Sequence, residues 1–323
     1  MKLGIDAMSG DLGSRIVVEA CLSFLEKNKT DELYVVGKIE ELEALKPYDQ
    51  VTLIDAREVL EMTENILAIR RKKESSMVKT MMLARKGEVD AVLSCGNTGA
   101  YYASAMLFLK RIEGVEKSCL MAMMPTYSDN KVAMLDVGAN SENTAEQLKS
   151  FAIMGNAYAK NVLKITNPKI ALLNIGSEHH KGDEIHQETY KLLEDMQEIN
   201  FVGNIEGKEI LDGEVDVVVT DGFTGNVALK TIEGVAKVLK SLKDGFMSST
   251  RTKAGAVLAK PALKQLLTKF DTKAAGGALM MGFVKPVIKA HGSSDAIAFE
   301  NAINLAFEMV SSDVVEKMKE GLN

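Results

Sequence analysis

The chain has 323 residues, of which 46% are hydrophobic, 26% charged and 5% aromatic. This length predicts two ordinary domains or one large α/β domain, and the apolar content excludes an intrinsically disordered chain. The 39 Lys and Arg residues against 45 Asp and Glu residues give a net charge of −6. Nucleic acid is therefore not an expected partner, and any anion site must be local.

The cysteines and the N-terminus both predict a cytoplasmic protein. Cys21, Cys95 and Cys119 are odd in number and lack C-x-x-C spacing, which fits neither a disulfide framework nor a zinc site and indicates a reducing compartment. Residues 2–6 already have a strand-like pattern, without the features of a secretory signal. No apolar run approaches the roughly 18 to 20 residues that cross a bilayer. We expect a soluble protein that can still touch a membrane surface.

Short apolar runs of β type alternate with longer segments of helical periodicity. After the first strand, the predicted strands are 33–36, 51–54, 91–93, 132–135, 170–173 and 215–219. The predicted helices between them are 16–25, 77–85, 146–162 and 185–196. This alternation indicates an α/β fold with a mostly parallel, doubly wound sheet covered on both faces. No flexible linker divides the sequence, so we expect a single α/β domain over residues 1–323, either undivided or two-lobed.

Five predicted strands are followed by polar turns that contain glycine. These turns are 6–11, 94–99, 136–141, 174–178 and 221–226. Glycine beside Asp, Asn, Ser or Thr at a helix start exposes backbone N–H groups that can bind an anion, although one such turn alone would serve only as a cap. Because ligands bind beyond the carboxyl ends of strands in such sheets, we expect the five turns to line one edge and form an oxyanion site.

The familiar nucleotide, hydrolase and metal motifs are absent. The sequence contains no P-loop, no G-x-G-x-x-G after the first strand, no G-x-S-x-G and no H-E-x-x-H. His179, His180 and His186 lie close together in the sequence, but they do not form a recognisable set of metal ligands. We interpret them as solvated side chains. Neither a metal nor another cofactor is expected.

Basic residues cluster in two places. Residues 70–73 precede Ser75 and Ser76, and they either line a site for phosphate or an acidic partner or form a solvated charged face. Residues 245–270 contain no acidic side chain and predict a protruding cationic amphipathic helical pair for an anionic membrane surface or a partner protein. The alternative for this segment is a hairpin packed in a dimer interface or core. Its candidate contact residues are Arg251, Lys253, Val257, Leu258, Lys260, Leu263, Lys264, Leu266 and Leu267.

Taken together, the turns resemble the bacterial phosphate acyltransferase family of phospholipid synthesis, the PlsX family, over nearly the whole chain. The matching segments are 6–11, 70–77, 94–100, 135–140, 173–176 with 181–182, 200–204, 221–230, 276–278 and 288–294. The chain departs from the family pattern at Ser9, where a second glycine is usual, and at 12–14, where His or Asn followed by Ala-Pro is usual. A further departure is 274–275, where an aromatic residue often precedes the Gly-Gly pair.

The resemblance implies an isocitrate-dehydrogenase-like or isopropylmalate-dehydrogenase-like α/β/α fold and a homodimer. It also implies transfer of a long acyl chain from acyl carrier protein to inorganic phosphate, which gives acyl phosphate. Loose attachment to the inner face of the cytoplasmic membrane through residues 245–270 is implied as well. Two alternatives remain open: a phosphotransacylase that uses a short acyl-CoA, and a non-catalytic membrane-surface scaffold that binds acyl carrier protein.

Direct attack by phosphate on the thioester is our mechanistic hypothesis, because phosphate is already a nucleophile and needs positioning and oxyanion stabilisation. The candidate phosphate or oxyanion ligands are Gly96, Asn97, Thr98, Gly225 and Asn226, with Lys181 and Lys230 supplying charge. A bare carboxylate repels phosphate, so the remaining polar residues are expected to orient these donors. They are Asp6, Asp11, Asp136, Asn140 and Asp221.

Two further side chains are candidates for chemistry. His291 is expected to carry a proton to or from the leaving thiol, and the alternative is an ordinary loop histidine. Cys95 lies at a predicted helix start, where a thiolate is favoured, so an acyl-cysteine is a second route. The family resemblance favours a small residue such as alanine at that position and therefore argues against this route.

Overall fold

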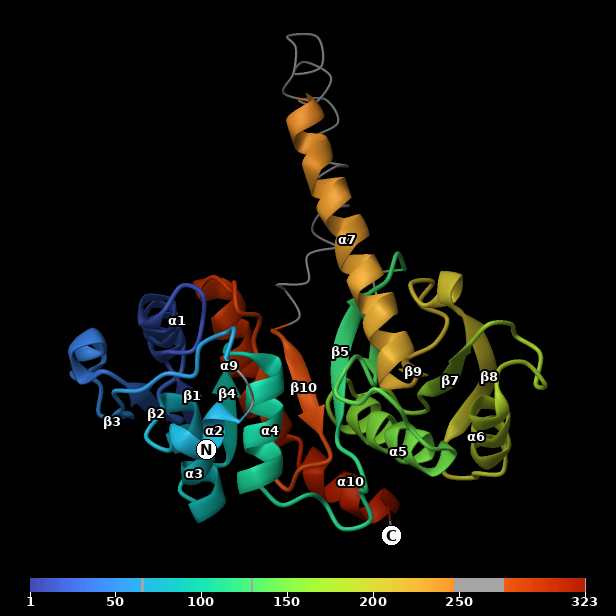
Figure 1. Ribbon diagram of the computed structural model, residues 1–323, viewed down its shortest axis with the longest axis horizontal. Helices are drawn as coiled ribbons and strands as arrows, with labels where there is room; N and C mark the ends of the chain where they lie inside the picture. Colours follow the sequence, from blue (N-terminus) through green and yellow to red (C-terminus); the bar gives the residue numbers. More distant parts are fainter. Residues whose placement is uncertain (65–66, 129, 247–275, 323) are drawn as a thin grey trace.

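The computed structural model describes residues 1–64, 67–128, 130–246 and 276–322. Its strands are β1 (Lys2–Asp6), β2 (Glu32–Gly37), β3 (Val51–Asp55), β4 (Ala91–Ser94), β5 (Cys119–Pro125), β6 (Lys131–Leu135), β7 (Lys169–Asn174), β8 (Asn200–Glu206), β9 (Val217–Val219), β10 (Ala278–Met281) and β11 (Val287–Lys289). Within the described ranges they form one eleven-stranded sheet in the order β3-β2-β1-β4-β11-β10-β5-β6-β9-β7-β8 (Figure 1).

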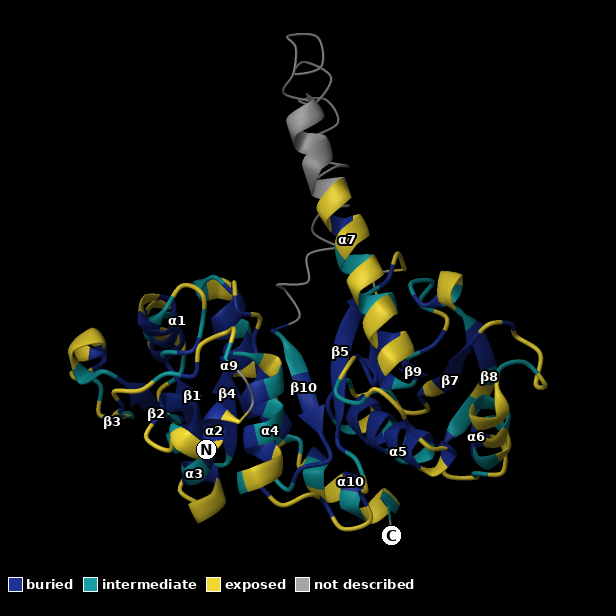
Figure 2. Ribbon diagram, viewed as in Figure 1, coloured by how far each residue is buried: buried dark blue, intermediate teal, exposed yellow. Residues whose placement is uncertain are grey.

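Helices cover both faces of this sheet. They are α1 (Ser14–Lys27), α2 (Ala68–Arg71), α3 (Ser76–Lys86), α4 (Thr98–Phe108), α5 (Ala145–Asn161), α6 (Glu184–Glu194), α7 (Gly222–Phe246), α9 (Ala296–Ser311) and α10 (Val314–Leu322). Successive strand residues face opposite layers: in β4, Leu93 packs into the core under α1, α5, α9 and α10, and Val92 packs into the core under α3 and α4. Figure 2 shows the buried strands between helices whose outer sides are exposed.

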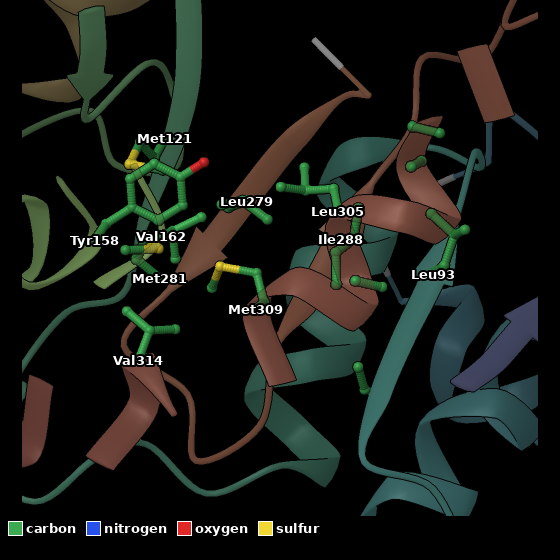
Figure 3. Close-up of a cluster of buried hydrophobic side chains, with 14 of the residues drawn as sticks. Leu93, Met121, Tyr158, Val162, Leu279, Met281, Ile288, Leu305, Met309 and Val314 are labelled. Atoms are coloured by element: carbon green, nitrogen blue, oxygen red, sulfur yellow. The ribbon is translucent and has the colours of Figure 1, made fainter. Parts of the chain in front are cut away.

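A continuous apolar core crosses the middle of the sheet. It runs from Leu93 of β4 through Ile288 of β11 and Met281 of β10 to Tyr158 of α5. Met309 of α9 lies between Met281 and Ile288 in the close-up of this cluster (Figure 3). The central strands therefore join the two halves of the sheet through packed side chains as well as through backbone hydrogen bonds.

The direction of the strands changes at the centre of the sheet. All neighbouring pairs are parallel except β11 with β10, β10 with β5, and β5 with β6, so β6 to β8 run opposite to β1 to β4. The expectation that all five glycine-containing turns line one edge is therefore wrong. Turns 6–11 and 94–99 follow strands of one direction, and turns 136–141, 174–178 and 221–226 follow strands of the other.

The predicted α/β class with a mostly parallel sheet is confirmed. Each predicted strand and helix overlaps an observed element, whereas β5, β8, β10, β11, α2, α4, α9, α10 and nearly all of α7 were not predicted. The long helix α7 begins beside β9 and extends away from the sheet (Figure 1). Of the predicted cationic segment 245–270, only the end of α7 is described. All its candidate contact residues, from Arg251 to Leu267, lie outside the described residues.

Candidate functional site

The loops that follow β1, β4 and β11 meet at one place, and we call residues 6–11, 94–97 and 289–294 the first loop group. Asp11 donates its backbone N–H to the carbonyl of Gly292 at 3.0 Å. A Cβ built on Gly10 would lie 2.5 Å from the sulfur of Cys95, so the backbone of the first loop passes directly over this thiol. Only glycine fits such an approach.

Asp6 is buried and organises the first loop group from within. Its Oδ2 accepts the hydroxyl of Ser94 at 2.7 Å, and its Oδ1 accepts the N–H of Met8 at 3.2 Å. The Ser94 oxygen in turn accepts the N–H of Gly96 at 3.0 Å. Asp6 thus holds the turns after β1 and β4 together, and the Gly96 N–H is used by a hydrogen bond within its own loop.

Asn97 and Thr98 begin α4 at the edge of the first loop group. The Asn97 side chain caps the helix by accepting the N–H of Ala100 at 2.9 Å, and its amide donates to the carbonyl of Met62 at 2.5 Å. The Met62 methyl lies close to Gly292, since a Cβ built there would be 3.0 Å from it. Residues before α2 therefore border the site. In the first turn of α4, the N–H groups of Thr98 and Gly99 have no intrahelical acceptor.

The loops that follow β6, β7 and β9 form a second cluster, the second loop group, comprising residues 136–143, 174–182 and 221–226. Its anchor is Asp136, a buried carboxylate that accepts the backbone N–H groups of Leu120, Gly138, Ala139 and Asn140 at 2.9–3.1 Å. The Asn140 side chain adds a bond to Asp136 at 2.8 Å. Both predicted orienting residues thus shape the backbone of one turn.

The first turn of α7 packs closely against the backbone of residues 136–140. A Cβ built on Gly225 would lie 1.9 Å from the carbonyl oxygen of Asp136, and one on Gly222 would lie 2.0 Å from that of Asn140. The N–H of Gly225 donates to the carbonyl of Asp221. Asp221 Oδ1 also accepts the N–H of Thr224 at 2.9 Å, which caps the helix. The amides of Gly222, Thr224 and Gly225 are therefore engaged within the loop group, whereas the side chain of Asn226 is exposed.

Lys181 lies in the loop between β7 and α6. Its carbonyl accepts the side-chain amide of Asn174 at 3.1 Å, and its methylenes lie against Gly176. His186 Nδ1 lies 2.7 Å from Asp183 and its Nε2 lies 3.9 Å from Asp221, which connects this loop to the start of α7. The hydrogen bond with His186 lowers the pKa of Asp183. Lys181 is therefore a member of the second loop group.

The first loop group lies within electrostatic reach of α7, the helix that begins in the second loop group. Partial burial lowers the pKa of His291 below its usual value, and the charges of Lys289 and Lys230 act in the same direction, while Glu233 and Asp11 oppose them. Lys230 and Glu233 lie on the third and fourth turns of α7, whereas His291 and Asp11 belong to the first loop group. Predicted residues of the first loop group thus share one electrostatic environment with Lys230 of α7.

The hydrogen bonds of His291 define its tautomer. Ser293 donates its backbone N–H to His291 Nδ1 at 3.2 Å, and its hydroxyl lies 3.0 Å from the same nitrogen. A nitrogen that accepts an N–H carries a lone pair, so the neutral ring holds its proton on Nε2. Because its pKa is lowered, this neutral form persists at pH 7 and presents an N–H donor rather than a base.

The Cys95 thiol is unsuited to nucleophilic attack. Burial raises its pKa to about 12, and the negative charge of Asp6 acts in the same direction. The thiolate is the reactive form of cysteine, so Cys95 is inert at neutral pH. Its packing against Gly10 gives it a structural role instead.

Sequence reasoning missed Lys289 as a site residue. It ends β11, is only 6% exposed, and belongs to the motif 288–294, in which only His291 was selected. Burial lowers its pKa to about 8, against the opposing charges of Cys95, Asp11 and Asp6. The sequence did contain one indication, a lysine directly after the apolar residues Val287 and Ile288. A lysine buried in such a strand needs an anionic or polar partner.

The described residues include no group of three or more His, Cys, Asp or Glu side chains arranged to hold a metal ion. In the same ranges, no helix combines the length and hydropathy required to cross a membrane.

The basic residues at 70–73 differ in their contacts. Lys72 bonds to Glu64 and to the carbonyl of Val59, which leaves Arg70, Arg71 and Lys73 exposed.

Comparisons with known proteins cover nearly the whole chain. A family model described as "Fatty acid synthesis protein" matches residues 1–317. A phosphate acyltransferase of Lysinibacillus sphaericus is 46% identical over 323 residues, covering 99% of this chain and 98% of the relative. A phosphate acyltransferase of Bacillus licheniformis is 43% identical with the same coverage.

Solved structures with low sequence identity share the fold. A phosphotransacetylase from Streptococcus pyogenes is 18% identical with a TM-score of 0.61, covering 98% of this chain and 94% of that one. A 4-hydroxythreonine-4-phosphate dehydrogenase from Klebsiella pneumoniae is 11% identical with a TM-score of 0.53, covering 96% and 99%. The expected three-layer α/β fold of dehydrogenase type is thereby confirmed.

Proposed function

The chain belongs to the family of fatty acid synthesis proteins whose curated relatives are named phosphate acyltransferase, and from this premise we propose that it transfers an acyl group to inorganic phosphate. The single structural observation that supports this best is that the first loop group lies within electrostatic reach of α7, the helix that begins in the second loop group. The charges of Lys230 and Glu233 on α7 and of Asp11 in the first loop group all act on His291, and Lys230 also pairs with Glu233 at 2.9 Å. Such a polar environment suits a reaction between an anion and a polar ester.

In the proposed reaction, a phosphate oxygen attacks the thioester carbonyl carbon, the carbon–sulfur bond breaks, and the thiol leaves with a proton. The chain must hold phosphate against its charge repulsion and stabilise the tetrahedral oxyanion. Lys230 and Lys181 supply positive charge, and the Asn226 side chain supplies a donor. His291 acts as an N–H donor to the oxyanion through Nε2, a role that its tautomer favours over the proton transfer expected from sequence.

The direct route is favoured over an acyl-cysteine intermediate. Cys95 is buried, its pKa is raised to about 12, and its sulfur is covered by the backbone at Gly10. An acyl chain on this sulfur would displace the first loop. The thiol therefore serves packing in this proposal.

The proposed donor is a long acyl chain on acyl carrier protein, and the product is acyl phosphate for phospholipid synthesis. Arg70, Arg71 and Lys73 supply an exposed cationic surface for an acidic carrier. The segment before this surface reaches the site, because the Met62 carbonyl accepts the Asn97 amide. A carrier docked at α2 would thus lie beside the first loop group.

A homodimer and a loose association with the inner face of the cytoplasmic membrane complete the proposal. Phe223, Val227 and Val235 of α7 are 68%, 52% and 53% exposed, and a second copy of the chain would cover these apolar side chains. The membrane contact rests on the family resemblance and on the basic composition of residues 251–264.

A second candidate is a phosphotransacylase that uses short acyl-CoA, favoured by the fold shared with a phosphotransacetylase. Purified protein is incubated with phosphate and either long-chain acyl carrier protein or acetyl-CoA, and acyl phosphate is trapped with hydroxylamine. The proposal predicts at least 100-fold higher kcat/KM for the carrier-bound long chain. Preference for acetyl-CoA would establish the second candidate, and carrier binding without phosphate-dependent thioester loss would indicate a scaffold.

A further inference from the structure

Lys289 is a buried cation whose hydrogen-bonding capacity is not filled. Among the described residues its ammonium has one acceptor, the carbonyl oxygen of Ala290, and no carboxylate within ion-pair distance. An ammonium has three N–H donors, and leaving them unpaired away from water is unfavourable. An anion is the partner that would satisfy it.

The hydroxyl of Ser9 is a second donor in the same region. Its Oγ is buried, and within the described structure it has no hydrogen-bond partner. Ser9 contacts the loop after β4, since a Cβ built on Gly96 would lie 2.6 Å from Ser9 Cβ. The neighbouring Cys95 side chain lies within electrostatic reach of Lys289. Two undersatisfied donors therefore belong to loops that touch.

We propose that Lys289 and Ser9 form the floor of an oxyanion pocket that takes inorganic phosphate. The identity of the anion rests on the proposed function, in which phosphate is the acyl acceptor. Phosphate offers several acceptor oxygens and a negative charge, which match an ammonium and a hydroxyl together. The charge of Lys230 on α7 also acts on Lys289, so a bound anion would lie within electrostatic reach of a second cation, one that pairs with Glu233 at 2.9 Å.

The charges around Lys289 make the pocket sensitive to pH. Asp6 of β1, Asp11 of the following loop and Cys95 after β4 favour its protonated form, whereas Lys230 of α7 disfavours it, and His291 lies near it in the same loop. Burial outweighs the favourable charges and lowers the pKa of Lys289 to about 8. If the ammonium holds phosphate, phosphate affinity must fall as pH rises through 8.

Phosphate binding is measured by calorimetry at constant ionic strength, without any acyl donor, at pH 7.5 and 9.5. The wild-type Kd is expected to rise at least tenfold between these values. Lys289→Gln should weaken phosphate binding at least tenfold at pH 7.5 and remove its pH dependence. Lys289→Arg should bind phosphate with the same affinity at pH 7.5 and pH 9.5. Lys285→Gln is the matched control on the same hairpin, because Lys285 also donates to a backbone carbonyl, that of Val89.

Ser9→Ala removes only the hydroxyl and should weaken phosphate binding about threefold to tenfold. Dimethyl phosphate tests whether the pocket takes a phosphodiester, such as that of a carrier's prosthetic arm, and should bind at least tenfold more weakly. Wild-type binding that is independent of pH, or unchanged binding in Lys289→Gln, would overturn the inference. The wild-type titration decides it even if the variants fail to fold. If phosphate binds through Lys289 but the protein transfers no acyl group, the phosphate site stands and only the proposed function is contradicted.

Discussion

The hydroxyl of Ser94 donates to Asp6 Oδ2 over 2.7 Å, although 88 positions separate the two residues in the sequence. Each is the last residue of its strand, and the strands β4 and β1 are parallel neighbours. The same hydroxyl oxygen accepts the N–H of Gly96, so one buried carboxylate fixes the backbone of two turns. In the second loop group, Asp136 fixes the backbone of the turn that follows β6 and also accepts the N–H of Leu120 in β5. In the proposed mechanism, aspartates at or just after strand ends therefore hold in place the loops that bind substrate.

Gly225→Ala is expected to disrupt the second loop group. The added Cβ would meet the carbonyl oxygen of Asp136 at 1.9 Å, which no side-chain movement can relieve. We expect a loss of activity of at least 100-fold and a lower Tm, measured by steady-state kinetics and thermal unfolding. Gly234→Ala is the matched control on α7, where nothing lies within 4 Å of the added Cβ, and it should raise stability by about 0.5–1 kcal/mol. Equal effects of the two variants would contradict this view of the loop.

The protonation of His291 is expected to set the acid limb of the pH dependence of kcat/KM. Its pKa lies below 6.5 because of partial burial and of the cations Lys289 and Lys230, so the neutral donor persists to lower pH. The logarithm of kcat/KM should fall only below pH 6.5. Lys230→Met removes one cation and should move this limb to higher pH, while Lys237→Met, two turns further along α7, should leave it in place. A limb unmoved by Lys230→Met would contradict the electrostatic interaction between α7 and the first loop group.

Cys95→Ala should retain activity within about twofold, because the thiol is protonated and buried rather than nucleophilic. Gly10→Ala alone should impair the enzyme, since its Cβ would lie 2.5 Å from the Cys95 sulfur. Combining the two should recover part of that loss, as a double-mutant cycle measures for residues in contact. Complete inactivation by Cys95→Ala with an intact fold would restore the acyl-cysteine route.

The buried ammonium of Lys289 also predicts how stability depends on pH. Its folded pKa of about 8 lies below the unfolded value of 10.5, so the unfolded chain binds more protons between these values. The Lys289 contribution to the free energy of unfolding must then rise with pH across this window, by about 3 kcal/mol in all. The stability advantage of Lys289→Met over wild type should shrink accordingly in urea titrations. Comparing the two proteins cancels the alkaline ionisation of Cys21 and Cys119. An advantage independent of pH would contradict a lowered pKa.

The fold could be predicted where strand composition was distinctive. Runs such as Val217–Val219 are rich in β-branched residues, and α5 has clear helical periodicity. The strands β5 and β10 were missed because their buried sequences, CLMAMMP and ALMM, consist largely of methionine, alanine and leucine, which favour helices as readily. These same strands reverse the direction of the sheet, so missing them led to the wrong expectation of a single edge.

The site could be predicted only as a set of turns. Glycine beside short polar residues identified the loops, and the structure places Asp6, Asp136 and Asn140 where they orient them. Sequence could not show that the amides of Gly96 and Gly225 are engaged by neighbouring residues, because those contacts depend on three-dimensional packing. Lys289 was missed for a similar reason, since nothing local reveals that β11 lies in the centre of the sheet.

Phosphate-dependent formation of acyl phosphate tests the account most directly. Purified protein is mixed with long-chain acyl carrier protein and ³²P-labelled phosphate, and label in acyl phosphate is followed together with the release of free thiol. We predict one labelled acyl phosphate for each thiol released, and no thiol release when phosphate is omitted. Thiol release that proceeds without phosphate, or unlabelled product, would contradict the proposed transfer.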